Sequence, residues 1–369
     1  MIAIKQILAA ASLYLLALTV SAEVVRDLYE SRSLVSAQTR SERVVAAKQG
    51  LLQVLVKVSG QTDVSANPVV QAAMKKTQNY ILQFSYESTD ERIELEGGQT
   101  QPATLLLLKF SPQAIEGLLR AASLPLWPAN RPSVLVWLVS DEINRGRNLV
   151  SDPDTYDHLI ASAKERGLPL VKPLFDLQDQ IALDPGGLWS MDQGMIADAS
   201  ERYGADGVLL GRYTEFSNGR WRADWNLLHK GTSVAFQSDG ESSEDLLSQG
   251  VGQTADRLAS LFAIVPSNVQ SGRVFAEVSG VDAFGGYIKV LDYFSNLDMV
   301  RDAQVKQVSG DTLLFSLNLE GGQALLLDTI ALDKFLSLGR DNQQLRLPGN
   351  RYIPRGIEDN PLQFSWTAP

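Results

Sequence analysis

An apolar run behind a proline constrains the fold of this chain more than any other stretch. Pro132 precedes an unbroken apolar segment from Val134 to Val139. Such a run fits a strand that is buried on both faces, as in a parallel sheet covered by helices. Helical and strand patterns alternate over residues 152–213, and tight turns follow at Asn218-Gly219 and Lys230-Gly231. We therefore predict a twisted, open α/β sheet that is built around the 134–139 segment.

The predicted central domain covers residues 127–268. It combines a mixed open sheet in β-α-β-α-β order with a meander and a closing helix, and a second strand is expected at Leu168–Leu174. A third strand is expected at Gly207–Tyr213, and the closing helix at about 243–264. Capping residues at the expected helix starts and glycines at the expected ends support these helices.

Two smaller α+β domains are expected to flank the central one. Residues 23–126 carry a long amphipathic helical pattern, two strand patterns and a further helix. Residues 269–339 follow β-α-β-β-α order, which resembles half of a ferredoxin-like fold. The tail, residues 340–369, has little periodicity, so we expect a loop or a peripheral arm. The fold class is thus an α/β centre with two α+β flanks.

The first 22 residues have the pattern of a signal peptide. Lys5 gives a positive start, the stretch from Ile7 to Val20 is apolar, and small residues lead up to Ala22. We expect export to the periplasm with cleavage after Ala22. The apolar run is shorter than the roughly 20 residues that a membrane span needs, and no later run is long enough. The mature chain should therefore have no stable membrane span.

Charge and cysteine content exclude several classes of function. The chain has 33 basic and 43 acidic residues, for a formal net charge of −10, and no basic cluster interrupts this balance. Nucleic acid is therefore not an expected partner. The chain has no cysteine, which excludes disulfides, thiolate nucleophiles and cysteine-ligated metals.

Three stretches carry a resemblance to a known family. They are residues 123–139 (SLPLWPANRPSVLVWLV), residues 165–179 (ERGLPLVKPLFDLQD) and residues 201–213 (ERYGADGVLLGRY), the last continuing to Trp225. Together they resemble the bacterial family called domain of unknown function 2066. The resemblance implies an exported protein of Gram-negative bacteria, but it implies no catalytic residue because that family has no assigned activity. The third stretch also resembles envelope-assembly α/β domains, such as the amino-terminal domain of TolB, in fold only.

No common hydrolase or nucleotide-binding motif occurs in the chain. The segment Gly250–Ala255 matches a relaxed dinucleotide fingerprint, but it lies inside a helical pattern where that chemistry needs a strand, so no cofactor or metal is expected. Open α/β sheets place ligands at the carboxyl ends of their strands, where Asp141 and Asp176 are expected. Arg145 lies near Asp141 in the sequence and could receive an anionic group. These three residues form the candidate ligand site.

Trp221 and Trp225 are expected on one face of the meander, and the polar residues that alternate with them are expected on the opposite face. The two tryptophans could form an aromatic platform for a partner, or they could pack under the closing helix. We expect a non-enzymatic binding or envelope-assembly module with a protein partner in the cell envelope. The alternatives are a small-ligand-binding protein or hydrolase that uses Asp141 and Asp176, and a structural domain of a larger assembly.

Overall fold

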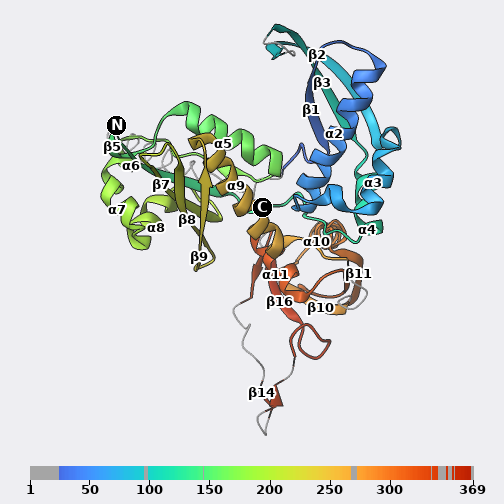
Figure 1. The fold of residues 1–369 in the computed structure, drawn as a ribbon. Coiled ribbons are helices and arrows are strands. Elements are labelled where there is room, and N and C mark those ends of the chain that lie inside the picture. Colours follow the sequence, from blue (N-terminus) through green and yellow to red (C-terminus); the bar gives the residue numbers. More distant parts are fainter. Residues whose placement is uncertain are drawn as a thin grey trace, which may run out of the picture.

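The computed structural model describes residues 25–94, 99–143, 145–266, 272–333, 335–339, 346–347, 351–352 and 354–366. The predicted signal peptide, residues 1–22, lies outside the described part of the chain. Three lobes, each built on its own sheet, meet near the middle of the molecule (Figure 1). No helix in the described part of the chain is both long and apolar enough to cross a membrane.

The N-terminal lobe is a three-stranded antiparallel sheet with helices on one side. Its strands, in the order in which they pair, are β1 (Glu30–Val35), β3 (Thr100–Phe110) and β2 (Ile81–Glu94). Its helices are α2 (Arg40–Ser59), α3 (Pro68–Met74) and α4 (Pro112–Ala121), with short 3-10 turns η1 (Val64–Ala66) and η2 (Thr77–Tyr80). Thr39 caps the start of α2, because its side chain accepts the Glu42 amide, and Gly60 caps its end in the left-handed conformation that glycine favours.

The central lobe has a sheet with strand order β5-β4-β7-β8-β9, and β6 also pairs with β4. These strands are β4 (Val134–Glu142), β5 (Gly146–Leu149), β6 (Leu170–Val171), β7 (Gly207–Glu215), β8 (Trp221–His229) and β9 (Thr232–Gly240). One face packs against α5 (Pro153–Arg166) and α9 (Ser243–Phe262). The other face packs against α7 (Pro185–Ser190) and α8 (Gln193–Glu201), which follow α6 (Leu177–Ala182).

Strand β4 is buried from Val134 to Ser140 and contributes side chains to the cores on both faces of the sheet. The neighbouring strand is shorter than predicted. Only Leu170 and Val171 pair with β4, whereas a strand was expected over residues 168–174. Further along the same edge of β4, from Val139 to Glu142, the hairpin strand β5 pairs with β4, which the sequence did not indicate.

The C-terminal lobe corrects the expectation for the tail. Its sheet has the order β11-β12-β10-β16-β13, and residues 346–347 and 351–352 form a separate hairpin, β14 (Arg346–Leu347) and β15 (Arg351–Tyr352). The sheet strands are β10 (Gly272–Ser279), β11 (Val300–Ser309), β12 (Thr312–Leu319), β13 (Leu336–Leu338) and β16 (Leu362–Trp366); the helices are α10 (Phe284–Ser295) and α11 (Gln323–Asp333). Strand β16 pairs in parallel with β10, so the tail supplies an interior strand rather than a peripheral arm.

The three lobes are joined by shared cores. Buried residues of the N-terminal and C-terminal sheets belong to one continuous apolar cluster, and Leu332 of α11 belongs to the core of the central lobe. The coarse fold class predicted from the sequence, mixed α/β with α+β parts, is confirmed. The lobes nevertheless bury parts of one another. The division into separate domains that the sequence suggested does not include these shared cores.

Candidate interaction site

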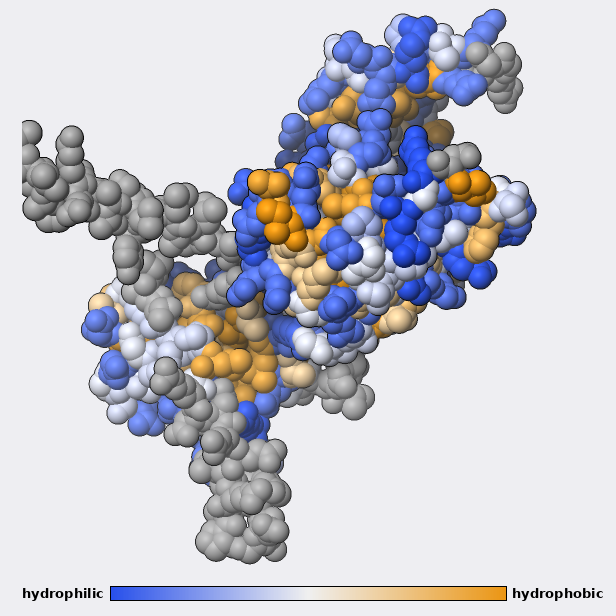
Figure 2. Space-filling view, turned by 90° about the vertical axis from the view of Figure 1, so that its left-hand side faces the viewer, coloured by the Kyte–Doolittle hydropathy of each residue, from blue (hydrophilic) through white to orange (hydrophobic). Residues whose placement is uncertain are grey.

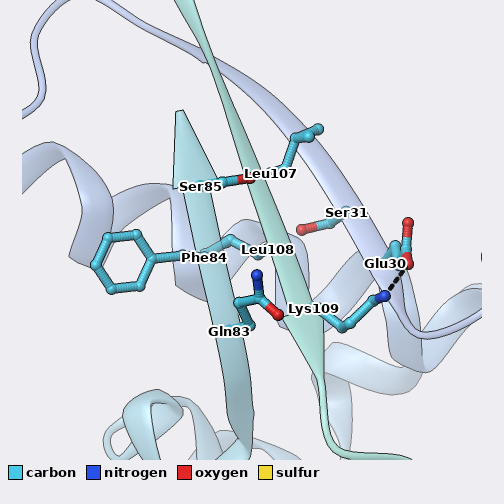
Figure 3. A pocket seen from close by; sticks show the side chains of 8 residues that line it. All are labelled: Glu30, Ser31, Gln83, Phe84, Ser85, Leu107, Leu108 and Lys109. Carbon is cyan, nitrogen blue, oxygen red and sulfur yellow. Dashed lines mark ion pairs between the residues drawn. The ribbon is translucent and has the colours of Figure 1, made fainter. Parts of the chain in front are cut away.

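The N-terminal sheet has one covered and one open face. Along β3, Leu106 and Leu108 are buried on the side of α2, while Leu107 and Lys109 point to the other side, as the two-residue period of a strand requires. Helix α2 lies over β1 and β3, and no described helix packs against the opposite face. Figure 3 shows this open face, where Glu30 joins Leu107 and Lys109 around a depression of about 140 Å³.

The open face has apolar residues in the middle and polar residues on either side. Leu107 lies in register with Arg32 of β1 and Ser85 of β2. One step along β3, Leu105 lies between Leu34 and Glu87 in the same way. At the end nearer α4, Lys109 pairs with Glu30, with a distance of 3.0 Å between Nζ and Oε1. A stripe of leucines bordered by charges is typical of a surface that binds another protein.

Strand β2 adds an unpaired edge to this face. Within the described part of the chain it pairs with β3 alone, so its outer backbone groups have no neighbouring strand among the described residues. Leu82 lies at an irregularity in the ladder and is 66% exposed, and Phe84 is 46% exposed. The Arg43 guanidinium lies 4.4 Å from the centre of the Phe84 ring and donates a hydrogen bond to the Tyr86 hydroxyl. The ring is therefore held in place and remains accessible.

This arrangement suits binding better than catalysis. The depression is shallow and open, and its lining offers hydroxyl, amide and ion-paired groups rather than a nucleophile next to a base. In the described part of the chain, no group of three or more His, Asp or Glu side chains is placed to hold a metal ion. What the surface can offer a ligand is a flat apolar stripe and a free strand edge.

The predicted ligand residues of the central lobe do not form a shared site. Asp141 pairs with Arg147 at 3.3 Å, and Arg145 pairs with Glu142 at 3.6 Å. Asp176 pairs instead with Arg202, the residue that follows α8. The two carboxylates were expected on neighbouring strand ends, but β5 occupies the edge of β4 beside Asp141. The chain after β6 leaves the sheet.

Asp176 holds α6 in place. Its side chain caps the helix by accepting the Asp179 amide, and both of its oxygens accept hydrogen bonds from the Arg202 guanidinium, at 2.9 and 2.7 Å. Asp179 is 1% exposed and accepts the Phe175 amide and the Tyr203 hydroxyl. Burial and the hydrogen bond to Asp179 raise the pKa of Tyr203 to about 12. The cluster is satisfied by its own members.

The ion pair between Asp176 and Arg202 makes the stability of the folded chain depend on pH. Hydrogen bonds from Arg202 lower the pKa of Asp176 in the folded protein to about 2, below its value of about 4 in the unfolded chain. The ionised carboxylate therefore stabilises the folded state at pH values above about 4. This contribution is lost as the pH falls towards 2. In Arg202→Gln we expect the pKa of Asp176 to rise to about 3 to 4, read from the carboxyl carbon in an NMR titration. A pKa that stays near 2 would show that the backbone amides alone set it.

The two tryptophans of the meander have different surroundings. Trp225 is 1% exposed, stacks on Phe236 and donates its indole N–H to Ser238 at 2.8 Å. Trp221 is half-buried and lies tilted against Tyr213, with ring centres 5.8 Å apart. The structure therefore places Trp225 in the core under α9, and only Trp221 reaches the surface of β8.

Comparison with known proteins overturns the family resemblance drawn from the sequence. A family model described as Domain of unknown function (DUF8605) matches residues 22–128, which include the whole N-terminal sheet. This is a different family from domain of unknown function 2066, so the earlier assignment is wrong. A search of curated proteins finds no match. The matched part of the chain is therefore similar to an uncharacterised domain.

Two solved structures show distant likeness. The LpoB C-terminal domain from Salmonella enterica is 14% identical, with 30% of this chain and 83% of that chain covered and a TM-score of 0.22. An uncharacterized protein is 12% identical, with 35% of this chain and 97% of that chain covered and a TM-score of 0.16. TM-scores this low do not establish a shared fold.

Sequence reasoning identified the strand patterns of the N-terminal lobe but did not point to the candidate interaction site there. The available signal is the segment Ile81–Tyr86 (ILQFSY), which has no charged residue and is rich in residues that favour strands. The pattern shows that a strand forms. Only the pairing order β1-β3-β2 shows that this strand is an edge.

Proposed function

We propose that this chain is an exported binding module of the bacterial cell envelope and that it engages another protein through the N-terminal sheet. The observation that carries the proposal is the open sheet face, with Leu105 and Leu107 at its centre, continuous with the free edge of β2. A half-buried apolar strip beside unpaired backbone groups favours a partner that covers it.

The signal-peptide pattern of residues 1–22 supports a periplasmic location for this module. The net charge of −10 supports a protein partner rather than nucleic acid. The alternative, a ligand site or hydrolase at Asp141 and Asp176, has less support because each carboxylate is paired with a different arginine. A general acid and base must lie within reach of one substrate.

Site-specific photo-crosslinking in cells tests this proposal. A photoreactive phenylalanine analogue at Leu107 or Phe84 is expected to give a discrete adduct with one envelope protein, because Leu107 lies on the open face and Phe84 lies on the free edge strand β2, with its ring on the α2 side. Matched controls are Leu177 on α6 and Val45 on the outer side of α2, which are exposed apolar residues away from the open face. The same adduct from the controls, or no adduct from either sheet position, would contradict the proposal.

A further inference from the structure

We infer that β2 accepts an added strand from an extended partner segment that is apolar at one end and basic at the other. The inference rests on the proposed function and names the partner's chemistry and its exact place on the sheet. Three properties of β2 carry it: a long unpaired edge, an uncharged half and an acidic half.

The edge is long enough to hold a strand on its own. Strand β2 has 14 residues, whereas strands usually have about 5 or 6, and among the described strands it pairs with β3 alone. Added strands gain main-chain hydrogen bonds along such an edge, and side-chain pockets on alternate residues select the sequence. An open edge of this length needs a protecting device or a partner.

The inner half of the strand is weakly protected: its ladder with β3 has one irregularity, at Leu82, but no charged residue or proline lies there. Proteins usually blunt an edge with lysine, proline or an inward-pointing charge, and residues 81–86 contain none of these. Instead, Leu82 and Phe84 are exposed there. Helix α2 lies over β1 and β3 rather than over β2, so the ring of Phe84 keeps an open side beyond Arg43. An apolar side chain of an added strand would cover this ring.

The outer half of the strand is acidic. Between Glu87 and Glu94 it carries four carboxylates and one guanidinium. That guanidinium, of Arg92, is directed at Thr100 of β3, with hydrogen bonds of 3.0 and 2.9 Å to its hydroxyl and carbonyl oxygens. No ion pair within the described part of the chain neutralises these carboxylates. Figure 2 shows the corresponding pattern, a hydrophilic outer end of the hairpin at the top with apolar side chains reaching the surface below it.

Charge complementarity indicates which kind of partner strand fits the edge of β2. A partner strand that covers the apolar half must run past the acidic half, so basic residues there would relieve the unpaired carboxylates. A second copy of this chain does not supply them, because its β2 carries the same four carboxylates and the same single arginine. Parallel self-pairing would set acid against acid, and antiparallel self-pairing would set acid against the apolar half. An extended segment with apolar and basic ends fits both halves.

Two probe peptides of about 12 residues, labelled with a fluorophore, test the inference on the whole exported chain. Both have alternating valine and threonine in one half; the other half alternates threonine with lysine in one probe and with glutamate in the other. In fluorescence anisotropy we expect the lysine probe to bind at least about tenfold more tightly than the glutamate probe, and less tightly at high salt. Phe84→Glu should weaken the lysine probe about tenfold or more, because it places a charge against the apolar half.

Control variants separate the possible outcomes. Leu177→Glu, on α6, should leave binding of the lysine probe unchanged. Leu82→Glu should weaken this binding as Phe84→Glu does. Because Leu82 is the more exposed of the two residues, Leu82→Glu replaces Phe84→Glu if circular dichroism shows that Phe84→Glu does not fold. Equal binding of both probes overturns the inference. Binding of the lysine probe that is lost in Leu107→Glu but kept in Phe84→Glu also overturns the inference. The partner would then bind the open face of the sheet rather than the edge of β2, and the proposed function would stand. Self-association in ultracentrifugation that Phe84→Glu abolishes would assign the edge to a second copy and overturn the inference too.

Discussion

Replacing Arg131 with methionine is expected to lower the free energy of unfolding by about 3–5 kcal/mol. The guanidinium is fully buried, and all of its partners are backbone carbonyl oxygens rather than a carboxylate. Its hydrogen-bond acceptors are the carbonyl groups of Lys57, Trp127, Pro128, Arg166 and Gly167. Methionine fills much of the space but leaves these acceptors buried without a donor.

The position of these carbonyls explains the size of the effect. Lys57 lies in the last turn of α2, and Arg166 and Gly167 lie at the end of α5, so one cation serves the negative ends of two helices from two lobes. The guanidinium carbon also lies 3.9 Å from the centre of the Trp127 ring. Burial lowers the pKa of Arg131 to about 9, so the group remains charged at neutral pH.

Denaturant unfolding followed by circular dichroism measures this effect. Arg145→Met serves as the matched control, since Arg145 is exposed and makes one surface ion pair, and it should change stability by less than about 0.5 kcal/mol. Arg131→Lys keeps the charge but offers three donors in place of five, so it should fall between the two. A loss below about 1 kcal/mol for Arg131→Met would mean that water replaces the guanidinium at these carbonyls.

Local sequence signals predicted local structure well. The apolar run 134–139 forms the strand buried on both faces, and Asn218-Gly219 makes the turn between β7 and β8. The serine and aspartate caps before Pro112 and Pro153 start helices as expected. Each of these features is set by neighbouring residues, through capping, turn geometry or side-chain period, and so can be read from the chain itself.

Pairing over long sequence distances could not be predicted in the same way. Strand β16 lies about 85 residues from β10 in the sequence, and its five residues show too short a pattern to distinguish a strand from a loop. The pairing of β5 with the edge of β4 likewise joins segments whose local patterns do not show which strand they pair with. The candidate interaction site depends on the same kind of information, because β2 is an edge only in relation to β1 and β3.

The glycines of the relaxed dinucleotide fingerprint lie in helix α9, where it packs against its neighbours. Gly250 lies in α9 and is buried against the ring of Trp225, where an added methyl group would fall well inside van der Waals distance of the ring carbons. The carbonyl of Gly252 accepts a hydrogen bond from Arg166 at 3.1 Å. An added methyl group at Gly252 would lie 3.3 Å from that same Arg166 nitrogen, so the lack of a side chain at both glycines allows close packing of α9 against its neighbours.

Gly250→Ala is expected to destabilise the protein by about 2–3 kcal/mol, because Trp225 must move from its stack on Phe236 and its hydrogen bond to Ser238. This loss exceeds the gain of up to about 1 kcal/mol that alanine brings to a helix interior. Gly117→Ala in α4 is the matched control, since no atom lies within 4 Å of the added methyl group there. It should stabilise the protein by about 0.5–1 kcal/mol. Thermal unfolding with tryptophan fluorescence as the probe measures both variants, and equal shifts of the same sign would contradict the close contact between α9 and Trp225.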